Sequence, residues 1–251
     1  MATVILLRHA RSSANGSGVL AGRTPGVGLD ETGLRQADGL PRRLAGVPVA
    51  AVVSSPLQRC QQTVAPLLAE RGLVAATDPD LAEVDYGEWT GRALKDLGQE
   101  KLWRVVQQHP SAAVFPGGEG LAGVQARAVA AIRAHDRRIT AEHGAHAVWL
   151  ACSHGDVIKA VVADALGVHL DGFQRIVVDP CSLSVVRYTE ARPFVLRVND
   201  NGGELADIVP PPPESSESTR LPDGQESTAD QDAESKPDES DAVVGGSTGG
   251  H

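Results

Sequence analysis

The stretch Thr3-Val-Ile-Leu-Leu-Arg8-His9-Ala10-Arg11-Ser12-Ser13-Ala14-Asn15 decides the fold of this chain. Residues 3–7 are β-branched or aliphatic and too few for a buried helix, so they predict a fully buried strand. Arg8 and His9 then lie at the carboxyl end of that strand, where open α/β sheets bind their ligands. A guanidinium beside an imidazole suits a reactive oxyanion, so we expect a phosphoryl-transfer site with His9 as nucleophile.

A second predicted strand brings another cation to the same edge. It covers residues 47–53, and Ser54-Ser55-Pro56 after it predicts a helix start with Ser55 as N-cap and Pro56 at the first helical position. Arg59 lies one turn into that helix. Its side chain can therefore reach the point where Arg8 ends the first strand.

A third predicted strand ends in a histidine. Residues 147–151 form the strand, and Cys152-Ser153-His154-Gly155 leads into a helix over residues 156–166 that stops at Gly167. His154 thus precedes a helix N-terminus, whose free N–H groups favour anions. Three strand ends therefore supply Arg8 with His9, Arg59 and His154.

The remaining pattern alternates between helices and strands. The Gly-rich residues 16–28 predict a loop that folds back over the strand end. Further helices are expected from residue 31 to a kink or end at Pro41, over 92–108, and along the face 124–139, and further strands over 173–179, 182–188 and 193–198. The sequence therefore predicts an α/β fold with a mostly parallel central sheet and helices on both faces.

The C-terminal part of the chain differs in composition from the rest. From Glu204 onward there are 12 Asp and Glu against Arg220 and Lys236, a net charge of −10. The whole chain carries −9, so residues 1–203 carry +1, the difference between the two values. This tail is rich in Pro, Ser and Gly and lacks aromatic residues, so it cannot bury enough apolar surface to order itself. We expect one domain over residues 1–202 and a disordered tail over 203–251.

Composition also argues against several classes of protein. Three cysteines make no even disulfide framework, and the N-terminal apolar run is too short for a signal peptide or a membrane span, so a cytoplasmic location is expected. There is no GxxxxGK[ST] motif and no basic stripe, so P-loop chemistry and nucleic-acid binding are not expected. The expected partner is a small phosphorylated substrate, with a homo-oligomer left open.

Six ordered motifs resemble one known family. They are Leu7-Arg8-His9-Ala10-Arg11-Ser12-Ser13-Ala14-Asn15, Leu29-Asp-Glu-Thr-Gly33-Leu-Arg-Gln36-Ala37, Ser54-Ser55-Pro56-Leu57-Gln58-Arg59-Cys-Gln-Gln-Thr63, Leu81-Ala-Glu83-Val-Asp-Tyr86-Gly87-Glu-Trp89-Thr-Gly91, Pro116-Gly117-Gly118-Glu119 and Ser153-His154-Gly155. Over about residues 3–190 the chain resembles the histidine phosphatase superfamily. The branch in question contains cofactor-dependent phosphoglycerate mutase, fructose-2,6-bisphosphatase and small bacterial phosphatases.

The resemblance implies a role for each matched residue. His9 would become phosphohistidine, while Arg8, Arg59 and His154 would hold the non-bridging phosphoryl oxygens. Glu83 would protonate the leaving oxygen and later deprotonate the attacking water. Three further positions match substrate contacts, namely Asn15, the backbone near Gly22, and the hydroxyl of Ser12. No metal or other cofactor is implied.

Two positions depart from the family pattern, and two carboxylates compete with Glu83. Ala10 stands where the family usually has glycine, and its methyl group is unfavourable only if φ must be positive there. Arg11 replaces an acidic or amide residue, so it either favours substrates with a second anionic group or stays exposed and idle. Asp85 and Glu88 lie near Glu83, but Glu83 matches the motif position of the acid.

Three functions remain open at the level of the sequence. The leading hypothesis is a metal-independent phosphatase that hydrolyses a small phosphorylated metabolite. A phosphomutase is the first alternative, but residues 91–120 carry few cations and not in the mutase pattern. A catalytically weak protein that binds a phosphorylated ligand is the second alternative, motivated by Ala10 and the acidic tail.

Overall fold

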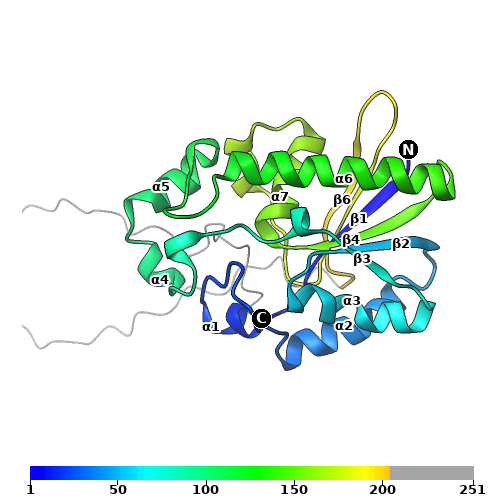
Figure 1. The fold of residues 1–251 in the computed structure, drawn as a ribbon, viewed down its shortest axis with the longest axis horizontal. Coiled ribbons are helices and arrows are strands. Elements are labelled where there is room, and N and C mark those ends of the chain that lie inside the picture. Colours follow the sequence, from blue (N-terminus) through cyan, green and yellow to red (C-terminus); the bar gives the residue numbers. More distant parts are fainter. Residues whose placement is uncertain (204–251) are drawn as a thin grey trace, which may run out of the picture. The chain divides into compact units, whose positions relative to one another are not determined.

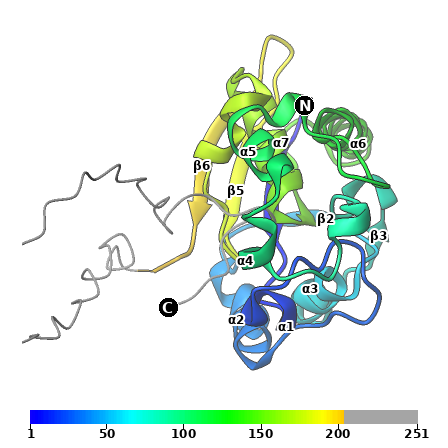
Figure 2. The same cartoon turned by 90° about the vertical axis from the view of Figure 1, so that its left-hand side faces the viewer.

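The computed structural model describes residues 1–203, and these form a six-stranded sheet between two layers of helices (Figure 1). The strands are ordered β3-β2-β4-β1-β5-β6 across the sheet. Their bounds are β1 Thr3–Arg8, β2 Val49–Ser54, β3 Ala75–Thr77, β4 Val148–Ser153, β5 Leu183–Arg187 and β6 Phe194–Asp200. Strands β1 to β4 run parallel. Strand β5 pairs antiparallel with β1, and β6 pairs antiparallel with β5, next to it in Figure 2. The predicted α/β fold with a mostly parallel sheet is confirmed.

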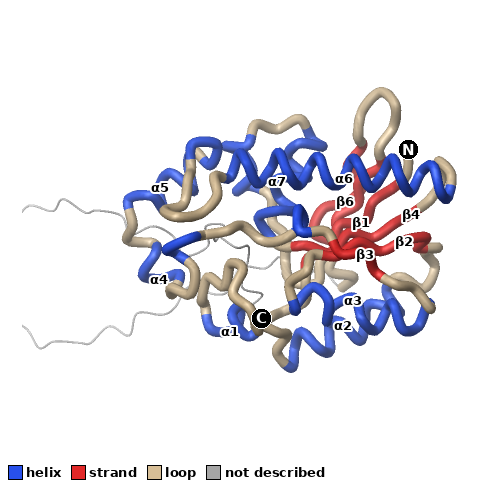
Figure 3. The backbone as a smooth tube through the Cα atoms, viewed as in Figure 1, coloured by secondary structure: helices blue, strands red, loops and turns tan. Residues whose placement is uncertain are grey.

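The two helical layers lie on opposite faces of the sheet, which Figure 3 draws in red. The helices are α1 Ser13–Ser17, α2 Glu31–Arg43, α3 Gln58–Arg71, α4 Leu94–Leu97, α5 Lys101–Gln108, α6 Leu121–His143 and α7 Gly155–Leu166. Helices α2 and α3 cover one face, and α6 and α7 cover the other (Figure 1). None of the helices within residues 1–203 is long and apolar enough to cross a membrane.

Alternation along β1 explains why both faces are apolar. Successive side chains of a strand point to opposite faces. Val4 and Leu6 accordingly belong to the core cluster beneath α6 and α7, whereas Ile5 and Leu7 belong to the cluster beneath α2 and α3. The continuous apolar run therefore places β1 in the middle of the sheet, with β4 on one side and β5 on the other.

Three expectations about local structure are wrong. Helix α3 begins at Gln58 with Leu57 as its N-cap, so Ser55 and Pro56 lie before the helix. No strand forms over 173–179, which overlaps the end of a 3₁₀ helix, Leu170–Arg175, because Phe173 packs into the core beneath α7 instead of pairing. The expected helix over 92–108 is divided into α4 and α5, since α4 ends at Leu97 with Gly98 as its C-cap.

Other elements were not expected or lie elsewhere. The short strand β3 and the short helix α1 were absent from the sequence-based prediction, and α2 runs two residues past Pro41 before it ends. Apart from its first residue, the predicted disordered tail lies outside the described residues. The Gly-rich loop does fold back, since the Gly22 carbonyl contacts Arg59 at the strand ends.

Candidate active site

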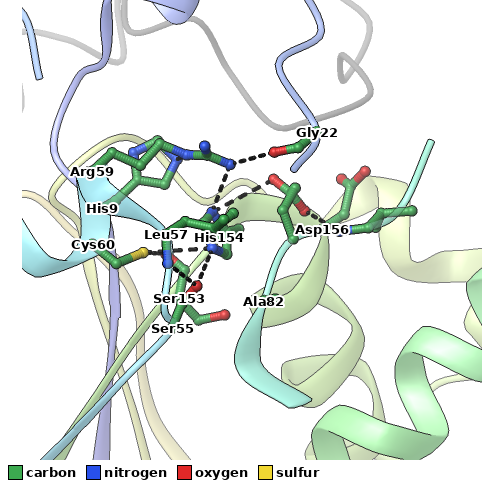
Figure 4. Close-up of polar contacts among 12 residues, drawn as sticks. His9, Gly22, Ser55, Leu57, Arg59, Cys60, Ala82, Ser153, His154 and Asp156 are labelled. Atoms are coloured by element: carbon green, nitrogen blue, oxygen red, sulfur yellow. Dashed lines mark hydrogen bonds and ion pairs between the residues drawn. The ribbon is translucent and has the colours of Figure 1, made fainter. Parts of the chain in front are cut away.

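The predicted site residues gather at the carboxyl ends of β1, β2 and β4. In the sheet, Arg8 of β1 lies opposite Ser153 of β4, and Ser54 of β2 lies opposite Cys152 of β4. The residues that follow these strands therefore meet at one edge. Figure 4 shows His9, Arg59 and His154 in contact there, with Gly22 reaching in from the Gly-rich loop.

His9 is held in one tautomer. Its Nδ1 lies 2.8 Å from the Ala10 carbonyl oxygen, which only accepts hydrogen bonds, so Nδ1 carries the hydrogen and Nε2 keeps its lone pair. Burial, together with the charges of Arg59 and Arg8, holds the pKa of His9 well below its usual value. The imidazole is therefore neutral near pH 7, and Nε2 can act as a nucleophile.

Arg59 connects the parts of the site. Its Nε donates to His9 Nε2 at 3.3 Å, and its Nη2 donates both to the Gly22 carbonyl at 2.8 Å and to His154 Nδ1 at 3.2 Å. Its Nη1 is buried and has no hydrogen-bond partner within residues 1–203. A buried guanidinium N–H without a partner is unusual, and an oxyanion would satisfy it.

His154 packs beside His9, with ring centroids 5.1 Å apart. Because Arg59 donates to His154 Nδ1, the hydrogen of the neutral ring lies on Nε2, which donates to the Ser55 hydroxyl at 2.8 Å. Burial is the main reason why the pKa of His154 is well below its usual value, and Arg59 adds to the effect. Ser55, expected to cap α3, therefore orients His154 instead.

Glu83 lies against this cluster as a buried carboxyl group. Its Oε2 is 3.9 Å from His154 Nδ1, and its Oε1 accepts the Val84 N–H at 2.9 Å. Burial, followed by the charge of Asp156, raises the pKa of Glu83 from 4.5 to about 7, although Arg59 opposes the shift. Such a carboxyl group can give and take a proton near neutral pH.

The two competing carboxylates lie elsewhere. Glu88 is exposed to solvent, and the Asp85 carboxylate accepts the backbone N–H of Gly87 at 3.0 Å.

Arg8 is fully buried and donates to the Val178 carbonyl at 2.7 Å. Burial lowers the pKa of Arg8, and the charge of Glu83 opposes this effect. Of the three carboxylates Glu83, Asp85 and Glu88, Glu83 is thus the buried one and lies near the cations of the site.

The predicted substrate-contact residues divide into two groups. Ser12 caps α1, and its hydroxyl donates to Asn15 Oδ1 at 2.8 Å, so these two side chains bond to each other. Gly22 lies in the site with φ of 50°, and its carbonyl orients Arg59. Arg11 pairs with Asp30 at 3.0 Å, so it is not an idle cation.

Ala10 brings no backbone strain. Among residues 1–203 the non-glycine residues with positive φ are Cys181 and Asn199, so Ala10 adopts an ordinary conformation. Its methyl group is fully buried in the core beneath α2 and α3, and its N–H donates to the Thr63 hydroxyl at 2.9 Å. The backbone at this position therefore does not require glycine.

The cationic groups of the site are arginine side chains. Within residues 1–203, no group of three or more His, Cys, Asp or Glu side chains is placed to hold a metal ion. The positive charge in the site comes instead from Arg8 and Arg59.

Comparisons with known proteins agree with this geometry. Residues 4–201 match the sequence model of the Histidine phosphatase superfamily (branch 1). The chain is 29% identical to phosphoserine phosphatase 1 of Hydrogenobacter thermophilus, over 79% of this chain and 92% of that protein. It is 30% identical to a probable phosphoglycerate mutase of Yersinia pestis, over 76% of this chain and 87% of that protein.

A solved structure of a phosphatase also resembles this chain. The alpha-ribazole phosphatase of Shigella flexneri superposes with a TM-score of 0.68 at 26% identity, covering 79% of this chain and 96% of that one. The match to the family model extends over most of the chain and includes all the strand ends described above. The chain therefore belongs to the histidine phosphatase superfamily, branch 1.

Proposed function

We propose that this protein is a phosphatase that hydrolyses a small phosphorylated metabolite in two steps, without a metal ion. The observation that carries the proposal is the pairing of His9 with Arg59. The neutral His9 ring keeps its lone pair on Nε2, and the buried Arg59 Nη1 beside it is left without a protein partner in residues 1–203. A nucleophile next to an unsatisfied guanidinium suits a phosphoryl group.

In the first step, His9 Nε2 attacks phosphorus and the bond from phosphorus to the leaving oxygen breaks. Glu83 gives its proton to that oxygen, so the product leaves as a neutral alcohol and Glu83 becomes a carboxylate. Arg8 and Arg59 neutralise charge on the non-bridging oxygens. His154 lies beside His9 and accepts from Arg59, which helps to hold that arginine in place.

In the second step, water attacks the phosphohistidine. The Glu83 carboxylate takes a proton from the water, the new bond from oxygen to phosphorus forms, and the bond from phosphorus to Nε2 breaks. Inorganic phosphate leaves, and both His9 and Glu83 return to their starting states. A pKa of about 7 suits Glu83 to act as acid in one step and base in the next.

The phosphoenzyme and the substrate class can be tested together. Phosphate release is measured over a panel that includes phosphoserine, 3-phosphoglycerate and an aryl phosphate, with wild type, His9→Ala and the exposed control His169→Ala. We expect activity in wild type and control, loss in His9→Ala, and an acid-labile phosphoryl adduct on His9. Equal, negligible release by wild type and His9→Ala would favour the ligand-binding alternative instead.

The mutase alternative has one observation in its favour, the name of the Yersinia pestis relative. Against it, two of the cationic side chains in residues 91–120 already bond to polar side chains of the protein. Arg92 pairs with Glu100 at 2.7 Å, and Arg104 bonds Gln108 at 3.2 Å. Incubation with 3-phosphoglycerate and 2,3-bisphosphoglycerate decides the matter, since rapid formation of 2-phosphoglycerate without phosphate release would show a mutase.

A further inference from the structure

The main chain that carries Glu83 is held by an arginine from α6. Arg127 makes five hydrogen bonds from its guanidinium group. They run from Nη1 to the carbonyls of Asp80 at 2.6 Å and Ala82 at 2.9 Å, from Nη2 to the Glu83 carbonyl at 3.2 Å, and from Nε and Nη2 to the Glu119 carboxylate at 2.9 and 3.0 Å. A short 3₁₀ helix, Pro79–Leu81, and the irregular chain after it leave the Asp80 and Ala82 carbonyls to accept from Arg127.

A second arginine, from the Gly-rich loop, donates to the same Glu83 carbonyl. Arg23 Nε donates to the Glu83 carbonyl at 2.8 Å, and Arg23 Nη2 donates to Glu119 Oε2 at 2.8 Å. Burial alone would raise the pKa of Glu119, but hydrogen bonds from Arg127 and the Asp85 N–H hold it below its usual value. Glu119 therefore stays charged and bridges the two arginines.

This network also touches the phosphoryl side of the site. Arg23 follows Gly22, whose carbonyl accepts from Arg59. Two adjacent loop residues thus fix the nucleophile's neighbour, Arg59, and the backbone of the acid, Glu83. A shift of this loop would change the distance between phosphoryl group and proton donor.

We propose that Arg127, bridged by Glu119 to Arg23, is a positioning residue that sets the Glu83 carboxyl group at proton-transfer distance from the leaving oxygen. This inference rests on the proposed phosphatase function. Arg127 contacts the acid through its backbone and takes no part in binding phosphate. A misplacement of about 1 Å in such a group can cost on the order of 10²-fold in rate.

The proposal predicts a dependence on the leaving group. An alkoxide is a poor leaving group and needs the proton of Glu83, whereas 4-nitrophenolate leaves without it. If Arg127 acts through Glu83, its loss should slow the cleavage of alkyl phosphates much more than that of 4-nitrophenyl phosphate. A general loosening of the fold would slow both alike.

The test measures kcat/KM, which reports on the steps up to formation of the phosphoenzyme, for an alkyl phosphate and for 4-nitrophenyl phosphate. For Arg127→Met we expect kcat/KM to fall on the order of 10²-fold with the alkyl substrate and by less than about threefold with the aryl one. Glu83→Gln should show the same pattern. Glu119→Gln, which keeps the shape of the bridge, should show it in weaker form and serves if Arg127→Met does not fold.

The matched control is Arg133→Met, on the same helix. Arg133 pairs with Asp164 at 2.8 Å on the surface and has no contact with the Glu83 segment, so both substrates should keep their wild-type rates. An equal fall for both substrates in Arg127→Met and Glu119→Gln would overturn the positioning role and leave the phosphatase proposal standing. A wild type no more active than His9→Ala would overturn both.

Discussion

Glu83 should make the stability of this protein depend on pH, and the variant Glu83→Gln isolates that effect. The residue is 4% exposed, and burial raises the pKa of its carboxyl group from 4.5 to about 7. Glutamine keeps an oxygen to accept the Val84 N–H at the same place but cannot ionise. A comparison of the two proteins therefore reports on the ionisation of Glu83 alone.

Proton binding by Glu83 decides whether stability rises or falls with pH. Below pH 4.5 the carboxyl group of Glu83 is protonated in the folded and unfolded states, so its ionisation has no effect. As pH rises toward about 7, the unfolded chain loses this proton while the folded protein keeps it, and wild-type stability falls. Above that range both states are ionised, and the loss is complete.

The same two pKa values of Glu83 give the size of the change in the free energy of unfolding. At about 1.36 kcal/mol per pH unit, the interval from 4.5 to about 7 corresponds to about 3 kcal/mol. The free energy of unfolding of Glu83→Gln, minus that of wild type, should therefore increase by about 3 kcal/mol between about pH 4 and about pH 8. The neutral variant is favoured at the alkaline end because it buries no charge.

Urea unfolding of both proteins, followed by circular dichroism across this pH range, measures the difference directly. Titrating groups that do not interact with Glu83 cancel in the comparison. A difference that stays constant with pH would refute the burial-raised pKa, and one that shrinks would show that Arg59 and Arg8 hold Glu83 ionised. In wild type, kcat/KM with an alkyl phosphate should fall as pH rises above about 7, because Glu83 loses the proton it must donate.

Three further substitutions probe the backbone and hydrogen bonds around the site. Gly22→Ala places a Cβ 2.9 Å from Thr90 Oγ1 at a backbone φ of 50°. We therefore expect a stability loss of about 1–3 kcal/mol, measured by urea unfolding. We also expect a raised KM, measured by steady-state kinetics. Ala10→Gly should lower stability by about 1 kcal/mol without raising kcat/KM, because φ is not positive there; a large gain in kcat/KM would contradict this. Ser55→Ala removes the hydroxyl that accepts from the buried Nε2–H of His154 and leaves the Cys60 sulfur, at 3.5 Å, as a weaker acceptor. We therefore expect lower kcat and a stability loss of about 1–3 kcal/mol. Wild-type kinetics would show that Ser55 does not orient His154.

Sequence-based predictions of local structure were wrong where a side chain bonds or packs against residues remote in sequence. Ser55 before Pro56 has the pattern of an N-cap, but its hydroxyl bonds His154, which is remote in sequence. The segment 173–179 has an apolar pattern compatible with a strand, yet Phe173 packs beneath α7 and Gln174 accepts from Lys159 at 3.1 Å. In both places the nearest neighbours in space, not in sequence, determine the conformation.

The amino-acid sequence by itself determined the architecture and the residues at the strand ends. Continuous apolar runs can bury both faces of a strand, so β1, β2 and β4 had to lie inside a parallel sheet with Arg8, His9 and His154 at one edge. Only the tertiary structure decided what those residues can do. The tautomer of His9, the raised pKa of Glu83 and the hold of Arg127 on its backbone depend on distances between distant segments and on exclusion of water. Local sequence patterns specify neither these distances nor the exclusion of water, because burial and the proximity of charges arise only when the chain is packed.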